Sequence, residues 1–158
     1  MSVTLSNLVR LSHIDTSHYE FYDDRVDRTI TSIAPLLERS PRALANSLSA
    51  LIRRQAGYRQ FIVSGSRGSS MTKTFIDLIH KKGSLAGSDF ILIHLDPDAP
   101  PKQLAERNKV LKGLIDDMEK RKLEGKEIHE DVRLCEGFTC RLPVSEVEDV
   151  ERLVLGVD

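Results

Sequence analysis

The sequence contains no tryptophan, few other aromatic residues and only two cysteines. Aromatic residues make up 5% of the chain, which argues against a protein that stacks several bases of a single nucleic-acid strand on its side chains. Two cysteines do not make a disulfide framework, so we expect a reducing compartment and a cytoplasmic protein. No apolar run approaches the roughly 20 residues of a membrane span, and no signal peptide is recognisable at the N-terminus. We therefore expect no membrane partner.

What the sequence does contain is typical of a globular protein. Its 158 residues correspond to one domain of ordinary size. Apolar residues make up 40% of the chain and charged residues 30%, which excludes an intrinsically disordered protein. A chain of this length can bury enough apolar surface to fold without disulfides or metals.

The net charge of −1 hides an uneven distribution along the chain. The segment 41–82 has eight Lys and Arg residues and one acid, Asp77, whereas both flanking segments are acidic. A basic segment predicts an anionic ligand or a nucleic acid as partner. The alternative is that folding disperses these charges over the surface.

The order of predicted elements indicates an α/β fold. Residues 1–22 are polar without a clear period, which predicts an irregular N-terminal arm. Residues 23–158 then form a single α/β domain, with a helical lead-in of two helices over 23–57 and a β-α-β-α-β-β-α order over 58–156. We expect a small sheet with a parallel β-α-β core and a C-terminal hairpin, and helices packed around it.

The β-α-β core rests on three consecutive segments. Residues 60–63 are apolar between glycines, the spacing of apolar residues over 70–82 is helical, and residues 90–95 are nearly all apolar. Two strands joined through a helix are expected to be parallel, with a right-handed crossover. A long helix over 101–124 should follow, and then a hairpin from 132–134 and 138–142.

The loop between the first strand and its helix is a candidate anion site. Free N–H groups at a helix N-terminus attract anions, glycines permit close approach of the backbone, and arginine and lysine supply positive charge. Neither the P-loop pattern nor G-x-G-x-x-G is present. The alternative is a flexible connection with a serine cap. The candidate ligand-binding residues are Ser64, Ser66, Arg67, Gly68, Ser69, Ser70 and Lys73.

This loop resembles that of sugar-isomerase domains, in which a serine-rich turn after a strand binds a sugar phosphate. The positions that match are Ser64, Ser66, Gly68, Ser70 and the helix-ending Gly83, and Arg67 is an insertion. The Gly-Ser-Arg string is also similar to the one in SLOG nucleotide-binding domains. Both resemblances imply a phosphate-bearing ligand.

Asp96 and Asp98 follow the second strand and form a candidate metal and catalytic site. Ligands of open parallel sheets lie beyond the carboxyl ends of the strands, where both loops should meet. Two carboxylates two residues apart can hold Mg²⁺, which binds phosphate oxygens in turn. The Asp-Pro-Asp string resembles the D-x-D of Toprim domains, although Ser64 occupies the position of their catalytic glutamate. The alternative is a turn, with Asp98 as a helix cap.

Cys135 and Cys140 flank the predicted hairpin turn and could meet across it, but two ligands do not make a zinc site. We expect two buried thiols.

Two functions are compatible with these residues. The first is a phosphate-recognising α/β domain that binds a nucleotide, sugar phosphate or nucleic-acid backbone, with Mg²⁺-dependent phosphoryl transfer or nuclease chemistry if it is an enzyme. The second is a non-catalytic regulatory or protein-interaction module, which could form a homo-oligomer. The sequence does not decide whether the protein is an enzyme, and it does not name the ligand.

Overall fold

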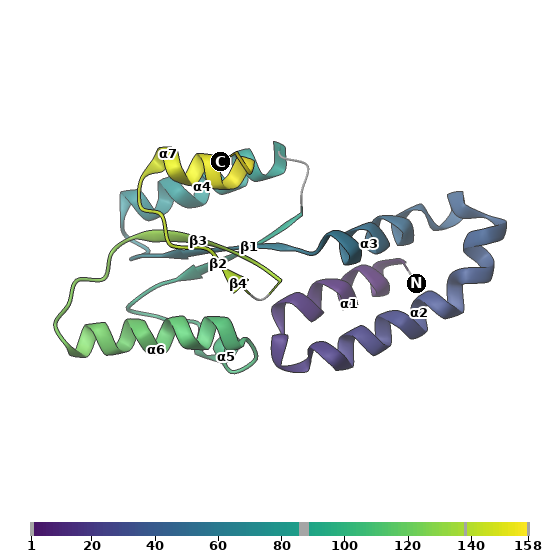
Figure 1. Cartoon of the computed structure of the whole chain (residues 1–158), viewed down its shortest axis with the longest axis horizontal. Helices are drawn as coiled ribbons and strands as arrows, with labels where there is room; N and C mark the ends of the chain where they lie inside the picture. Colours follow the sequence, from purple (N-terminus) through teal and green to yellow (C-terminus); the bar gives the residue numbers. More distant parts are fainter. Residues whose placement is uncertain (1, 86–88, 138, 158) are drawn as a thin grey trace. The chain divides into compact units, whose positions relative to one another are not determined.

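The computed structural model describes residues 2–85, 89–137 and 139–157 (Figure 1). The chain divides into two compact units, Met1–Tyr58 and Arg59–Asp158. The boundary between them follows Tyr58, whereas the sequence leads us to expect one domain that begins at residue 23.

The first unit is mainly helical. Leu5 and Val9 are fully buried one turn apart on α1, and this helix packs against α2 and α3. The expectation of an irregular arm over 1–22 is therefore wrong, because Leu5, Leu8 and Val9 do recur at helical spacing, a short signal among many polar residues. The elements are α1 (Ser2–Ile14), η1 (Thr16–His18), α2 (Tyr19–Arg39), η2 (Pro41–Leu44) and α3 (Ala45–Ala56).

Pro35 lies inside α2 and does not end it. The sequence predicts that the helix ends or kinks near Ile33, yet α2 continues to Arg39. A proline removes the N–H that would bond to the carbonyl four residues earlier, which here belongs to Thr31. Because Thr31 is exposed, water can bind this carbonyl, and the buried Ile33 keeps the helix packed on the core of its unit.

The second unit has a four-stranded sheet of order β2-β1-β3-β4. Strand β1 is parallel to β2 and antiparallel to β3, which confirms the predicted parallel pair and the mixed α/β fold. Figure 1 shows α4 and α7 on one face of the sheet and α5 and α6 on the other. The elements are β1 (Arg59–Ser64), α4 (Ser70–Leu85), β2 (Phe90–Leu95), α5 (Lys102–Ala105), α6 (Lys109–Leu123), β3 (Asp131–Glu136), β4 (Thr139–Cys140) and α7 (Val147–Leu155).

A hydrophobic core fills the space between the sheet and the α4–α7 pair. Alternate residues of a strand point to opposite faces, so every second residue of β1 and β3 enters this core. Its fully buried members are Phe61, Val63, Phe75, Ile79, Val132, Leu134, Val150 and Val154. The residues between them face α6, and on β3 these include Asp131 and Arg133.

Two predicted helix boundaries are wrong. The expected helix over 101–124 is divided into α5 and α6, because Asn108 Oδ1 accepts a hydrogen bond from the Leu111 N–H at 3.0 Å and caps a new helix. Helix α4 continues past Gly83 instead of ending there. A Cβ on Gly83 would lie 2.8 Å from the Phe90 ring, so this glycine permits close packing of the helix against β2. Residue 138 of the predicted hairpin lies outside the described residues.

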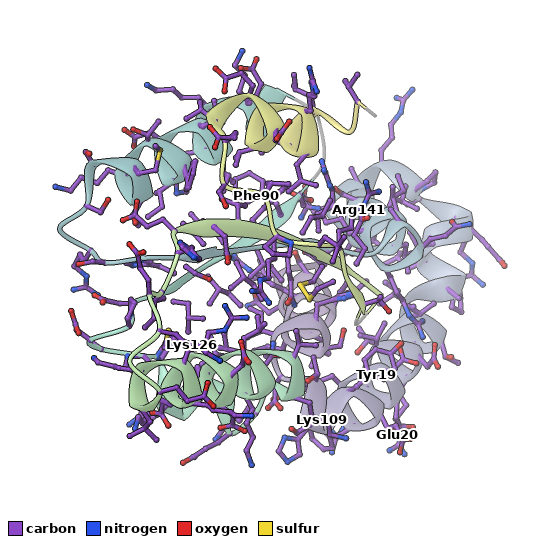
Figure 2. The ribbon with its side chains drawn as sticks, turned by 60° about the vertical axis from the view of Figure 1, so that its left-hand side comes forward. Tyr19, Glu20, Phe90, Lys109, Lys126 and Arg141 are labelled. Carbon is purple, nitrogen blue, oxygen red and sulfur yellow. A yellow bond between two sulfur atoms is a disulfide. The ribbon has the colours of Figure 1, made fainter. Side chains whose placement is uncertain are left out.

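Cys135 and Cys140 form a disulfide across the hairpin, visible as a yellow bond in Figure 2. The expectation of two thiols is wrong, because the register of β3 and β4 places the two residues directly opposite each other. Disulfides persist in oxidising compartments. The bond therefore does not favour the cytoplasmic location, which stays a prediction.

His13 is expected to make the stability of the first unit depend on pH. Its half-buried ring lies against Tyr58, with the ring centroids 5.1 Å apart. Burial lowers the pKa of His13 below its ordinary value of 6.5, and the charge of Asp23 offsets part of this effect. Since the unfolded chain binds the proton more readily, stability should fall as the pH drops below 6.5 toward the folded-state pKa.

We expect His13→Gln to reduce this acid sensitivity. The measurement is the free energy of unfolding in urea at about pH 7.5 and about pH 5.5, on either side of the ordinary histidine pKa. His80→Gln, which replaces an exposed histidine of the second unit, is the control. Equal losses of stability on acidification in wild type and His13→Gln would contradict the prediction.

Candidate functional site

The predicted anion loop is held against the end of β2. The Gly65 N–H donates to the Leu95 carbonyl at 3.1 Å, and His94 Nε2 lies 2.8 Å from the Gly65 carbonyl oxygen. These bonds bring the loop after β1 beside the loop after β2. The structure therefore confirms that the two loops lie together at one edge of the sheet, as the parallel pair predicts.

Ser69 already accepts hydrogen bonds from several backbone N–H groups at the N-terminus of α4. Its Oγ accepts hydrogen bonds from the Met71 and Thr72 N–H groups at 3.1 and 3.5 Å, and its carbonyl accepts one from Lys73 at 3.3 Å. These donors are no longer free for an anion. The other predicted ligand-binding residues of the loop are solvent-exposed: Ser66, Arg67, Gly68, Ser70 and Lys73. Anion binding by this loop stays a prediction.

Asp96 and Asp98 have local partners. Asp96 is buried, and its Oδ1 accepts a hydrogen bond from the Asp98 N–H at 3.0 Å, as in an Asx turn. Its Oδ2 lies 3.9 Å from Arg67 Nε, and Asp98 Oδ1 lies 3.0 Å from Lys122 Nζ. Within residues 2–85, 89–137 and 139–157, no three or more His, Cys, Asp and Glu residues form a group that could hold a metal. A magnesium or catalytic role for these aspartates stays a prediction.

Two arginines of the basic segment 41–82 have structural partners within their own units. Arg54 forms ion pairs with Asp23 and Asp27 at 2.7 and 2.6 Å inside the first unit. Arg59, in the second unit, donates to the carbonyl of Val154 at 2.8 Å and lies over a core phenylalanine ring. These contacts give both arginines structural partners, so neither is available to an extended nucleic-acid surface without breaking them.

A pocket of about 190 Å³ opens at the same edge of the sheet, on the face covered by α6. The chain that carries Lys126 in Figure 2 leads from α6 to β3 and forms one side of it. Ser64, at the end of β1, belongs to both this pocket and the loop. The apolar lining residues are Leu95, Leu114, Met118, Ile128 and Pro143. The polar lining residues are Ser64, Asp117, Arg121, His129, Asp131, Arg133 and Ser145.

Asp131 and Arg133 form the charged floor of this pocket. They lie two residues apart on β3 and therefore on the same face of the strand. Their side chains are only 12% and 22% exposed, and Arg133 Nη2 contacts Asp131 Oδ2 at 3.4 Å. Asp131 Oδ1 and Arg133 Nε are buried without a hydrogen-bond partner in the part of the chain that the structure describes. Each such atom costs about 1–3 kcal/mol, so two of them beside one pocket require an explanation.

A second ion pair lies at the rim. Arg121 Nε contacts Asp117 Oδ2 at 2.9 Å, one turn apart on α6, and both side chains are about half exposed. The pocket thus brings together two arginines and two aspartates, with one pair buried and one in contact with solvent. Such a site can bind ligands through charge-assisted hydrogen bonds of either sign.

The alternating pattern of residues 131–134 is a sequence signal for this site. Residues 131–134 alternate charged and apolar side chains, as a strand with one polar and one apolar face does. A charged face on a strand that pairs with the buried β1 has to lie in a cavity or at an edge. The α6 residues carry no comparable signal, because charged pairs four residues apart are common on exposed helices.

Comparison with known proteins gives one informative similarity. Human spermatogenesis-associated protein 20 is 28% identical over 153 residues, which are 97% of this chain and 18% of that protein. The chain thus corresponds in length to less than a fifth of that relative. No protein-family model matches the chain, and no solved structure matches it. The resemblances to sugar-isomerase, SLOG and Toprim domains therefore gain no support.

Among the described residues, no helix has the length and apolar character needed to cross a membrane.

Proposed function

We propose that the unit Arg59–Asp158 binds a small anionic molecule, a phosphate or a carboxylate, in the pocket between β3 and α6. The observation that carries the proposal is Arg133, a largely buried guanidinium whose Nε has no partner among the described residues. This proposal keeps the anion recognition expected from the sequence. It moves the site from the Ser64–Ser70 loop to the neighbouring pocket on the α6 face of the sheet.

Arginine suits this role. Its guanidinium is always charged, and its planar array of donors matches the oxygens of carboxylates and phosphates. A charged group held away from water forms stronger hydrogen bonds than the same group on the surface. Arg121 at the rim supplies a second guanidinium from α6, and the pocket lies at the carboxyl ends of β1 and β2, where ligands of open α/β sheets bind.

The loop is a weaker anion site because of its exposure and its hydrogen bonding. The Arg67 side chain is 80% exposed, whereas that of Arg133 is 22% exposed, so water screens the charge of Arg67 more strongly. Ser69 already binds the Met71 and Thr72 N–H groups of the helix terminus. An anion at the loop would have to displace these hydrogen bonds.

The test is calorimetric titration of the full chain with inorganic phosphate, glucose 6-phosphate, AMP and acetate. Arg133→Gln should weaken the binding of any of these probes by about tenfold or more, the scale for a hydrogen bond to a charged group. Arg67→Gln, in the loop, is the matched control and should leave binding unchanged. The reverse pattern would locate the anion site in the loop, and no binding by any probe would favour the regulatory or interaction module.

A further inference from the structure

We infer that the ligand of this pocket is a zwitterion, an α-amino carboxylate with a short aliphatic side chain. This inference rests on the proposed function, since it assumes that the pocket binds an anionic group. It adds a second requirement, a positively charged donor on the same molecule.

The charges of the pocket support a zwitterion over a simple anion. Asp117 and Asp131 match Arg121 and Arg133 in number, so the four side chains together carry no net charge. A phosphate dianion bound to Arg133 would face the largely buried carboxylate of Asp131 nearby, and like charges in a poorly solvated site repel strongly. A ligand with one charge of each sign avoids this repulsion and pairs with both residues.

The geometry of Asp131 and Arg133 also favours charges that lie close together. Their contact is long, at 3.4 Å, and each side chain retains one unpaired buried atom. Exchanging this weak contact for two ligand contacts would pair an ammonium with Asp131 and a carboxylate with Arg133. Because the two side chains are neighbours on one strand face, the ligand's charged groups should be attached to the same carbon.

Part of the remaining wall of the pocket is apolar, beside Ser64, His129 and Ser145. Leu95 closes one side at the end of β2, and Leu114 and Met118 of α6 lie along another. These apolar side chains interact unfavourably with water, so they favour an aliphatic group of the ligand. A volume of about 190 Å³ is small compared with pockets for nucleotides or drug-sized ligands, which fits a single amino acid.

The experiment compares four probes that share the same branched aliphatic group and differ in their charged groups, by calorimetry on the full wild-type chain. They are L-leucine, 2-hydroxy-4-methylpentanoate, 4-methylpentanoate and isopentylamine. L-Leucine should bind at least roughly tenfold more tightly than 4-methylpentanoate or isopentylamine, because each of these forms only one of the two ion pairs. The hydroxy acid has a neutral hydrogen-bond donor in place of the ammonium group, so its affinity should lie between those of L-leucine and 4-methylpentanoate. Because wild type alone decides this comparison, it does not depend on the folding of a variant.

Variants then test which charged group of the ligand pairs with Asp131. Asp131→Asn should weaken L-leucine binding by roughly tenfold and strengthen the binding of 4-methylpentanoate, since it removes a negative charge beside the carboxylate. Asp149→Asn, an exposed acid of α7 outside the pocket, is the control and should change neither.

The outcomes separate this inference from the proposed function. If phosphate or 4-methylpentanoate binds as tightly as L-leucine, the zwitterion is excluded while anion binding in the pocket stands. If Asp131→Asn leaves L-leucine binding unchanged, the assigned role of Asp131 is wrong. If no probe of either series binds, both the inference and the proposed function fail.

Discussion

Replacement of Gly65 by alanine is expected to destabilise the unit Arg59–Asp158 by about 3 kcal/mol. Gly65 has a φ of +145°, a conformation that residues with a Cβ rarely adopt. A Cβ there would also overlap Thr72 Oγ1 and lie 3.1 Å from Glu130 Cγ. Thr72 is buried in the first turn of α4 and cannot turn away without losing its contact with Glu130.

The matched control is Gly68→Ala in the same loop. A Cβ on Gly68 would have as its nearest neighbour the Ser66 Oγ at 3.9 Å, an ordinary van der Waals contact. This variant should lie within about 0.5 kcal/mol of wild type, as surface substitutions usually do. Urea unfolding of both variants measures the difference. If Gly65→Ala is as stable as Gly68→Ala, the loop does not have the conformation described.

The β-α-β core could be predicted because its signals are local. The apolar strand β1 is bounded by Gly57 and Gly65, and Ser69 caps the helix that follows. The parallel pairing then follows from a topological rule that needs no knowledge of distant residues. The same rule predicts that the loops after β1 and β2 meet, and the bond from Gly65 to Leu95 confirms it.

The pocket could not be predicted in the same way, because it depends on the register of distant strands. Asp131 pairs with Ser64, and Arg133 pairs with Ile62, so the partners in each pair are far apart in the sequence. Until that register is known, the two charged residues read as polar positions of an exposed hairpin. Ser64, one of the predicted ligand-binding residues, lines the pocket, whereas the charged side chains of the pocket come from β3 and α6.

The cysteines are a different case, in which a rule based on composition was misleading. A low cysteine count argues against a disulfide framework but says nothing about a single bond across a hairpin. The β3–β4 register places Cys135 opposite Cys140. Only the number of residues in the turn determines whether two such positions oppose each other, and the sequence left that number open.

Reduction of the Cys135–Cys140 disulfide is expected to destabilise the unit Arg59–Asp158 by about 2 kcal/mol. The bond joins residues five positions apart, and the chain-entropy relation gives about this value for so short a loop. Strand β4 has only two residues, and its ladder with β3 consists of the pairs Cys135–Cys140 and Glu136–Thr139. Because so short an edge strand has few other contacts, loss of the disulfide should let β4 separate from β3.

The measurement is urea unfolding of wild type with and without a dithiol reductant, followed by a probe in the second unit. The double variant Cys135→Ala/Cys140→Ala is the control, because it should resemble reduced wild type and should not respond to the reductant. The first unit contains no cysteine, so His13 and its neighbours should titrate identically in both redox states. An unchanged unfolding midpoint on reduction of wild type would mean that β4 is held by its backbone pairing and that the disulfide adds nothing to stability.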